Sequence, residues 1–132
     1  MVKLIIIRGI PGAGKSRLAN TLLECGVVQY VAEADQFWVD SDGIYKFDST
    51  KLASAHADCQ RRAAESLANG NSVAVSNTLT TEAEVAVYES IAKMYEAEFV
   101  SIVVENRHGG NNVHNVPRST LERMRTRFSI KV

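Results

Sequence analysis

Eight residues near the start of the sequence have the types and spacing of a phosphate-binding loop. Residues 9–16 read GIPGAGKS and match the pattern G-x-x-x-x-G-K-[ST] in full. Glycines let backbone N–H groups approach phosphate oxygens, the lysine neutralises the β- and γ-phosphates, and the hydroxyl is a Mg²⁺ ligand. The alternative is a strand-to-helix turn whose glycines have only a steric purpose. The pattern predicts an ATP site with Ser16 on Mg²⁺, formed by Gly9, Pro11, Gly12, Ala13, Gly14, Lys15 and Ser16.

One carboxylate is placed to accept the proton of an attacking hydroxyl, as a phosphotransferase requires. Asp35 follows a predicted strand, so we expect it at the same edge of the sheet as the phosphate loop. The alternative interpretation is that Asp35 caps the segment that begins at Gln36.

A polar run follows the third predicted strand. Many phosphate-loop proteins have an acid there, near Mg²⁺, but this chain has Ser76, followed by Asn77 and Thr78. Asn77 and Thr78 can hold water or substrate, or they are turn residues leading into a helix.

The C-terminal segment is basic, whereas the rest of the chain is acidic. Residues 106–132 contain six Lys or Arg and one acid, a net +5, although the whole chain has 15 of each sign. A glycine- and asparagine-rich loop before a basic helix is typical of lids that close on a transferring phosphate. We expect Arg107 there, with Arg123 behind it, unless these arginines only solvate a helix face. His114 is a turn residue or a substrate contact.

Apolar runs and amphipathic stretches alternate along the chain. Strands are expected at 2–7, 27–32, 72–76 and 98–105, and helices at 15–25, 52–67, 81–95 and from Ser119 onward. Capping boxes are expected at Thr81 with Glu84 and at Ser119 with Glu122. The alternation predicts one α/β domain over residues 1–132. Its fold is that of a P-loop NTPase, a doubly wound parallel sheet of four to five strands flanked by helices, with a C-terminal lid and helix.

The composition narrows the class of protein. No apolar run is long enough to span a membrane, and the N-terminal run is expected to be a buried strand and not a signal peptide. Cys25 and Cys59 are expected to be buried and reduced, as in a cytoplasmic protein. The sequence TKLA at 50–53 lacks the aspartate of a guanine-reading motif, so a GTPase is not expected, and a motor needs a longer chain.

Taken together, these residues resemble the polynucleotide 5′-hydroxyl kinase group of small P-loop kinases, which includes short AAA-like ATP-binding relatives from phages. The resemblance extends from Ile5 to Phe128. It is carried by RGIPGAGKS (8–16), ADQF (34–37), DGIYKFD (42–48), the segment 55–78, and HNVPRSTLERMRTRF (114–128).

The resemblance implies a role for each matching residue. Asp35 corresponds to the general base, Lys15 and Ser16 to the residues that handle phosphates and Mg²⁺, and Arg107 to the arginine that closes over the donor. The residues matching Asn77 and Thr78 help to position the site. A histidine matching His56 recurs in these relatives, although its spacing predicts a buried position on the apolar face of its helix.

Two positions depart from the group. Where these kinases carry an arginine that holds the acceptor's phosphate, this chain has Trp38, which could stack on a nucleobase or pack in the protein. Ser76 replaces the acid of many relatives. From the phosphate loop and the resemblance together, we expect an ATP- and Mg²⁺-dependent kinase whose acceptor is a polynucleotide 5′-hydroxyl. The alternatives are a nucleoside or nucleotide kinase, a non-catalytic ATP-binding module acting through a protein partner, and a slow ATPase without an acceptor.

Overall fold

The computed structural model describes residues 1–107 and 116–132 as an α/β fold. Its parallel sheet has the strand order β2-β3-β1-β4, which confirms the predicted doubly wound class. The strands are β1 (Lys3–Arg8), β2 (Tyr30–Ala32), β3 (Val73–Ser76) and β4 (Glu98–Val103). The helices are α1 (Lys15–Glu24), α2 (Leu52–Ala68), α3 (Glu82–Met94) and α4 (Arg118–Arg127), with 3₁₀ turns η1 (Ala34–Trp38) and η2 (Ser49–Lys51).

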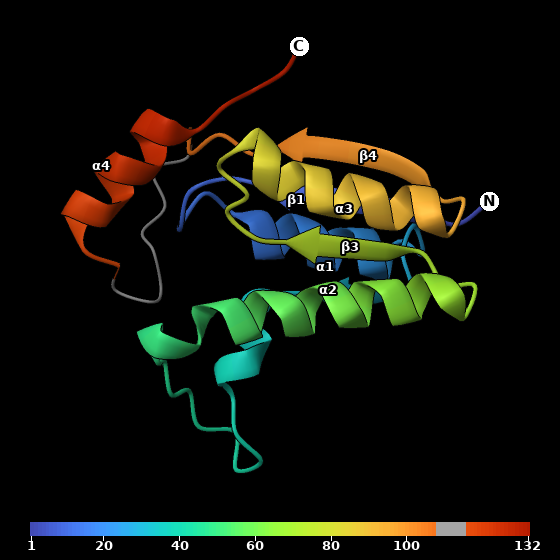
Figure 1. Ribbon diagram of the computed structural model, residues 1–132, viewed down its shortest axis with the longest axis horizontal. Coiled ribbons are helices and arrows are strands. Elements are labelled where there is room, and N and C mark those ends of the chain that lie inside the picture. The colour runs from blue at the N-terminus through green and yellow to red at the C-terminus, as the bar shows by residue number, and fades with distance from the viewer. Residues whose placement is uncertain (108–115) are drawn as a thin grey trace.

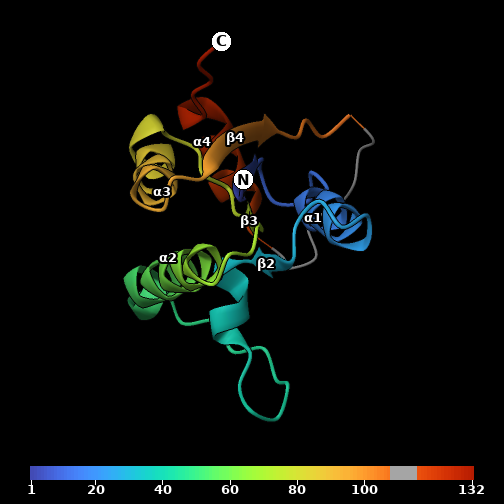
Figure 2. The same cartoon turned by 90° about the vertical axis from the view of Figure 1, so that its right-hand side faces the viewer.

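Helices cover both faces of the sheet (Figure 2). Successive residues of β1 point to opposite faces, so Ile5 and Ile7 pack toward α1, whereas Leu4 and Ile6 pack toward α2 and α3. A strand covered on both faces has to be apolar throughout, which is why β1 shows a continuous run of large apolar residues.

The second strand is shorter than the predicted range 27–32. The backbone N–H groups of Val27 and Val28 bond to the Leu22 carbonyl at the end of α1, at 2.9 and 3.4 Å. These residues therefore complete the turn after α1, and the strand begins only at Tyr30.

One predicted capping box is partly present and the other is wrong. Thr81 caps α3, since its hydroxyl accepts from the Glu84 N–H at 3.4 Å, but the Glu84 carboxylate bonds to the Thr80 N–H at 2.7 Å. Ser119 is not a cap, because α4 begins one residue earlier, with Pro117 at its N-cap and no side-chain capping bond.

A buried arginine fastens the chain beyond α4 to the sheet. Arg8, the last residue of β1, is 3% exposed and donates to the Leu79 carbonyl at 2.8 Å and the Ser129 carbonyl at 2.6 Å. Its guanidinium carbon lies 5.0 Å from the centroid of the Phe128 ring. These contacts hold α4 beyond the carboxyl ends of the strands (Figure 1).

The predicted burial is correct for one of three side chains, Cys59, and wrong for the other two, Cys25 and His56. Cys59 is buried with its thiol free, as predicted, but Cys25 is exposed at the end of α1. The prediction that His56 is buried is wrong: His56 is exposed, because the buried face of α2 runs through Ala55, Cys59 and Ala63. In the described part of the chain, no helix combines the length and apolar character needed to cross a membrane.

Candidate active site

The loop between β1 and α1 requires glycine at three positions. Gly12 and Gly14 have φ angles of 87° and 99°, in the left-handed region that favours glycine. At Gly9 the constraint is space, since a Cβ there would lie 2.8 Å from the Val104 carbonyl oxygen. The sequence pattern therefore corresponds to a real conformational need in this loop.

The other loop residues complete a turn that opens directly into α1. Pro11 is half-buried, and Ala13 is fully buried and donates its N–H to the Ile10 carbonyl at 3.2 Å. Ser16 is exposed in the first turn of the helix. That turn contains no acidic side chain, so the N–H groups and the positive end of the helix dipole favour an anion here.

Lys15 connects the loop electrostatically with the second strand's carboxyl end. Its Nζ donates to the Ile10 carbonyl at 3.1 Å, so the ammonium lies over the loop. Burial lowers the pKa of Lys15 from its ordinary value of 10.5, and the negative charges of Asp35 and Glu33 act in the opposite direction. The structure thus brings the loop lysine into the field of two carboxylates.

Asp35 lies in the first turn of η1 and is half-buried. The N-cap of this turn is Glu33, so the interpretation of Asp35 as a cap for the segment beginning at Gln36 is wrong. Burial, and then the charge of Asp35, raise the pKa of Tyr45. Asp35 therefore interacts with Lys15 and also with the segment that follows η1.

A hydroxyl without a partner lies at the end of β3. Ser76 is 5% exposed, and its Oγ has no hydrogen-bond partner among the described residues. Ala74 packs on the α1 side of the sheet, so Ser76, two residues later, faces the same side as the phosphate loop. Thr78, half-buried, accepts the Gly9 N–H at its carbonyl, at 3.2 Å.

Asn77, which we expected near the substrate, directs its amide into the protein. It is 8% exposed, and its Oδ1 accepts the Ala34 N–H at 2.9 Å. Its Nδ2 lies 3.5 Å from both Cys59 Sγ and Tyr88 OH. This geometry ties η1 to β3 and favours a positioning role for Asn77 over contact with a substrate.

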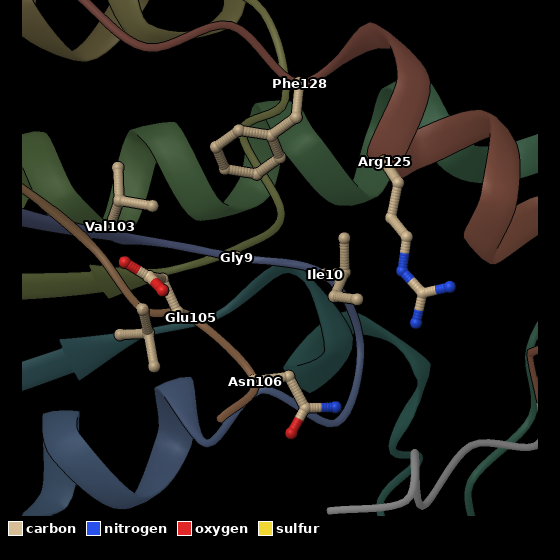
Figure 3. Close-up of a pocket in the computed structure, with 8 residues that line it drawn as sticks. Gly9, Ile10, Val103, Glu105, Asn106, Arg125 and Phe128 are labelled. Carbon is tan, nitrogen blue, oxygen red and sulfur yellow. The ribbon is translucent and has the colours of Figure 1, made fainter. Parts of the chain in front are cut away.

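A pocket of about 200 Å³ adjoins the start of the phosphate loop. It is lined by Gly9 and Ile10, by residues 103–106 at and beyond the end of β4, and by two side chains from the end of α4, Arg125 and Phe128 (Figure 3). Sequence reasoning missed these two. Their spacing of three residues, which places them on one side of a helical segment, is the signal that could have found them.

Arg107 and Arg123, which the sequence suggested would close on the transferred phosphate, do not line this pocket. Arg107 is 84% exposed and pairs with Glu105 at 2.6 Å, and Arg123 donates to the Thr120 hydroxyl at 3.1 Å. Neither is among the described residues that line the pocket. His114 lies outside the described residues.

Trp38 packs inside the protein, the second of its two predicted alternatives. It is 5% exposed, and its ring meets Phe37 and Phe47 edge-on, with centroids 5.2 and 5.0 Å apart. A second cavity, of about 500 Å³, opens beside these three rings, and its other lining residues are Asp40, Lys46, Asp48 and Lys51.

The segment after η1 folds as a small hairpin that the sequence analysis did not predict. Val39 and Tyr45 form an antiparallel bridge, and the Asp40 carboxylate accepts the N–H groups of Asp42 and Ile44 at 2.9 and 3.0 Å. The run DSDG at 40–43 is the turn signal that could have revealed it. The hairpin carries Phe47 to the cavity beside η1.

Comparison with known families gives one match over almost the whole chain. The family described as AAA domain matches residues 4–130. NEDD4-binding protein 2 of Homo sapiens is 34% identical over 97 residues, which are 70% of this chain and 5% of that protein. The chain thus spans only a small part of this curated relative.

Solved structures with the same fold include several kinases. A chain of the Pnkp1/Rnl/Hen1 RNA repair complex aligns with a TM-score of 0.74 at 18% identity, over 96% of this chain and 44% of that one. The Mycobacterium tuberculosis APS kinase CysC in complex with AMPPNP and APS aligns with a TM-score of 0.61 at 20% identity, over 92% and 67%. A sugar kinase from Janibacter sp. HTCC2649 aligns with a TM-score of 0.68 at 14% identity, over 100% and 80%. At these identities the likeness establishes a shared fold.

Proposed function

This chain belongs to the AAA-domain family, and on that premise we propose that it is an ATP- and Mg²⁺-dependent phosphotransferase. The proposed reaction moves the γ-phosphate of ATP to a hydroxyl acceptor, in the first place the 5′-hydroxyl of a polynucleotide. Asp35 accepts the proton of the acceptor hydroxyl, whose oxygen bonds to the γ-phosphorus. The bond from that phosphorus to the β–γ bridging oxygen breaks, and ADP leaves.

The observation that carries this proposal is that Asp35 and the phosphate loop lie at the same edge of the sheet, just after β2 and β1, where the charge of Asp35 acts on Lys15. A phosphate loop alone is compatible with a nucleotide-binding module, an ATPase or a kinase. A carboxylate whose charge acts on the loop lysine is placed where an acceptor hydroxyl and a terminal phosphate can meet. The pocket with Arg125 and Phe128 is the complementary feature on the donor side, with an apolar ring and a cation beside the loop.

Two hydroxyls fit the Mg²⁺ that such chemistry uses. Ser16 is exposed in the first turn of α1, and the buried Ser76 Oγ has no partner in the described residues, so both can contact the ion or its water shell. Mg²⁺ bound there supplies charge neutralisation for the β- and γ-phosphates. Within residues 1–107 and 116–132 no cluster of three or more His, Cys, Asp or Glu forms a separate metal site.

The cavity beside η1 is our candidate for the acceptor side. It begins two residues beyond Asp35 and has exposed aromatic surface on Phe47, which is 57% exposed. Its lining also has two cations, Lys46 and Lys51, beside two carboxylates, Asp40 and Asp48. Aromatic rings that stack on bases and cations that contact phosphates are the usual means of holding single-stranded nucleic acid. These features support a nucleobase-bearing acceptor.

The proposal is tested with ATP labelled on the γ-phosphate, Mg²⁺ and a panel of acceptors. The panel contains 5′-hydroxyl DNA and RNA oligonucleotides, nucleosides, nucleoside monophosphates, and a sample without acceptor. Label on the oligonucleotides supports the polynucleotide acceptor, and label on a small acceptor alone retains the chemistry but changes the substrate. Nucleotide binding without transfer to any acceptor contradicts the proposal and favours a binding module.

Phe47→Ala is expected to raise the KM for the labelled acceptor about 5- to 100-fold, with kcat and ATP affinity nearly unchanged. The reason is the loss of a base-stacking contact, which contributes roughly 1–3 kcal/mol. Ile44→Ala is the matched control, because Ile44 lies on the same hairpin and is 52% exposed but does not line the cavity. Equal KM values for the two variants would refute this assignment.

ATP affinity is expected to decline as the pH rises, and the decline should begin at a lower pH than for an ordinary lysine with a pKa of 10.5. The reason is that burial lowers the pKa of Lys15, and loss of its proton removes the charge that faces the phosphates. Binding of a non-hydrolysable ATP analogue, followed by calorimetry from neutral to alkaline pH, measures this. Lys15→Arg should remove the decline, since guanidinium stays protonated over this range. An identical decline in both proteins would mean that another group titrates.

A further inference from the structure

The short turn that carries Asp35 is fastened to the helix behind it by one arginine. Arg62 of α2 donates from Nη2 to the Glu33 carbonyl at 2.8 Å and from Nη1 to Tyr30 OH at 2.9 Å. Nη1 also donates to Gln36 Oε1, and Nε donates to Asp58 Oδ2 at 2.8 Å. One guanidinium therefore connects β2, both ends of the first turn of η1, and α2.

The neighbouring arginine makes no comparable contacts with the described residues. Arg61 is 57% exposed, and it pairs with Asp58 and Glu65 within its own helix, at 2.8 Å each. The Arg62 side chain is only 16% exposed. The two residues differ in what they hold and not in chemistry, which makes Arg61 a matched control for Arg62.

The turn needs such support, because five residues of 3₁₀ helix have little stability of their own. The Gln36 side-chain amide stabilises the turn with two hydrogen bonds: its Oε1 accepts the Glu33 N–H at 3.1 Å, and its Nε2 donates to the Val31 carbonyl at 3.2 Å. Arg62 braces this arrangement from α2. From the sheet, Asn77 accepts the Ala34 N–H at 2.9 Å. Asp35 lies between these attachment points in sequence.

We propose that Arg62 is a positioning residue that fixes the turn Glu33–Gln36, and with it the Asp35 carboxylate, relative to Lys15. Arg62 touches neither donor nor acceptor and acts through the backbone and side chains of η1. This inference rests on the proposed function only for its catalytic consequence. A misplacement of about 1 Å in a reacting group can cost up to about 100-fold in rate.

The test compares Arg62→Lys with Arg61→Lys. Lysine retains the charge beside Asp58, but its single ammonium cannot span the acceptors on β2, η1 and α2 that the guanidinium fork reaches. Trp38, the only tryptophan in the chain, is the last residue of η1 and is buried, so its fluorescence reports the position of the turn without any need for catalysis. Three measurements are made well below the melting temperature: Trp38 emission with acrylamide quenching, ATP binding to give the Kd, and transfer kinetics to give kcat and KM.

For Arg62→Lys we expect red-shifted, more readily quenched Trp38 emission and a kcat lowered about 10- to 100-fold, with an unchanged Kd for ATP. Arg61→Lys should match the wild-type protein in all three. A role confined to stability would lower the melting temperature and leave Trp38 emission and kcat unchanged, and that result would overturn the inference.

A milder variant covers the case in which Arg62→Lys does not fold. Tyr30→Phe removes one acceptor of Arg62 and should change Trp38 quenching and kcat in the same direction by a smaller factor. Where all variants fold, the double variant should be less than additive, because both substitutions break the same contact. If the wild-type protein transfers no phosphate, the proposed function fails, and the Trp38 comparison alone decides whether Arg62 fixes the turn.

Discussion

Asp35→Asn is expected to lower kcat for phosphoryl transfer by about 10²- to 10⁴-fold, the usual contribution of a general base. Asparagine has almost the same shape, so η1 should keep its attachment to Arg62 and Asn77. The loop that holds ATP is unchanged, and the Kd for ATP should stay near the wild-type value or fall slightly, since a negative charge near the phosphates is removed. Rapid-quench kinetics with labelled ATP give kcat, and calorimetry gives the Kd.

Asp42→Asn is the control for this substitution. It removes the same charge from an exposed position in the hairpin that follows η1. We expect wild-type transfer from this variant. If Asp35→Asn also transferred at the wild-type rate, Asp35 would not be the base, and the chemical interpretation of its proximity to Lys15 would have to be abandoned.

Lys15→Met is expected to impair binding and chemistry together. Loss of charge-assisted contacts to the phosphates should weaken ATP binding about 10- to 100-fold, because hydrogen bonds to charged groups contribute roughly 1.5–3 kcal/mol. The negative charge that develops on the transferred group in the transition state would also no longer be stabilised by a fixed cation. This loss should lower kcat by about 10²- to 10³-fold. Methionine fills the space of the lysine stem, so the loop should keep its packing.

Lys93→Met controls for the removal of a positive charge. Lys93 is exposed near the end of α3. This end of α3 leads into the start of β4, so Lys93 lies at the opposite end of the strands from the phosphate loop. It should bind and transfer like the wild-type protein. Tight ATP binding by Lys15→Met would show that the loop does not hold the phosphates as we describe.

The parts of the site that depend on local sequence were predictable. The phosphate loop is one continuous stretch whose glycines answer local backbone needs, such as the positive φ angles of Gly12 and Gly14. Asp35 follows a strand, and parallel strands end at one edge of the sheet, so its approach to Lys15 followed from topology. The sheet itself was predictable because residues 4–7 of β1 are a continuous apolar run.

The parts that depend on contacts distant in sequence were not predictable. Asn77 and Arg62 are 42 and 27 residues from Asp35 in sequence, and only the folded chain shows that their side chains hold η1. For His56, the apolar stripe of α2 was placed one residue off the buried Ala55. For the arginines near the C-terminus, charge alone could not distinguish Arg123 from Arg125, which lies beside the loop.

The most direct test of the account is the fate of the γ-phosphate in a single turnover of the wild-type protein. Labelled ATP and Mg²⁺ are mixed with excess protein and a 5′-hydroxyl oligonucleotide, and the label is divided between phosphate ester, inorganic phosphate and unreacted ATP. We predict that most of the label appears as ester on the oligonucleotide, with little free phosphate. Label found only in inorganic phosphate, or only in unreacted bound ATP with every acceptor supplied, would contradict the assignment of this chain as a kinase.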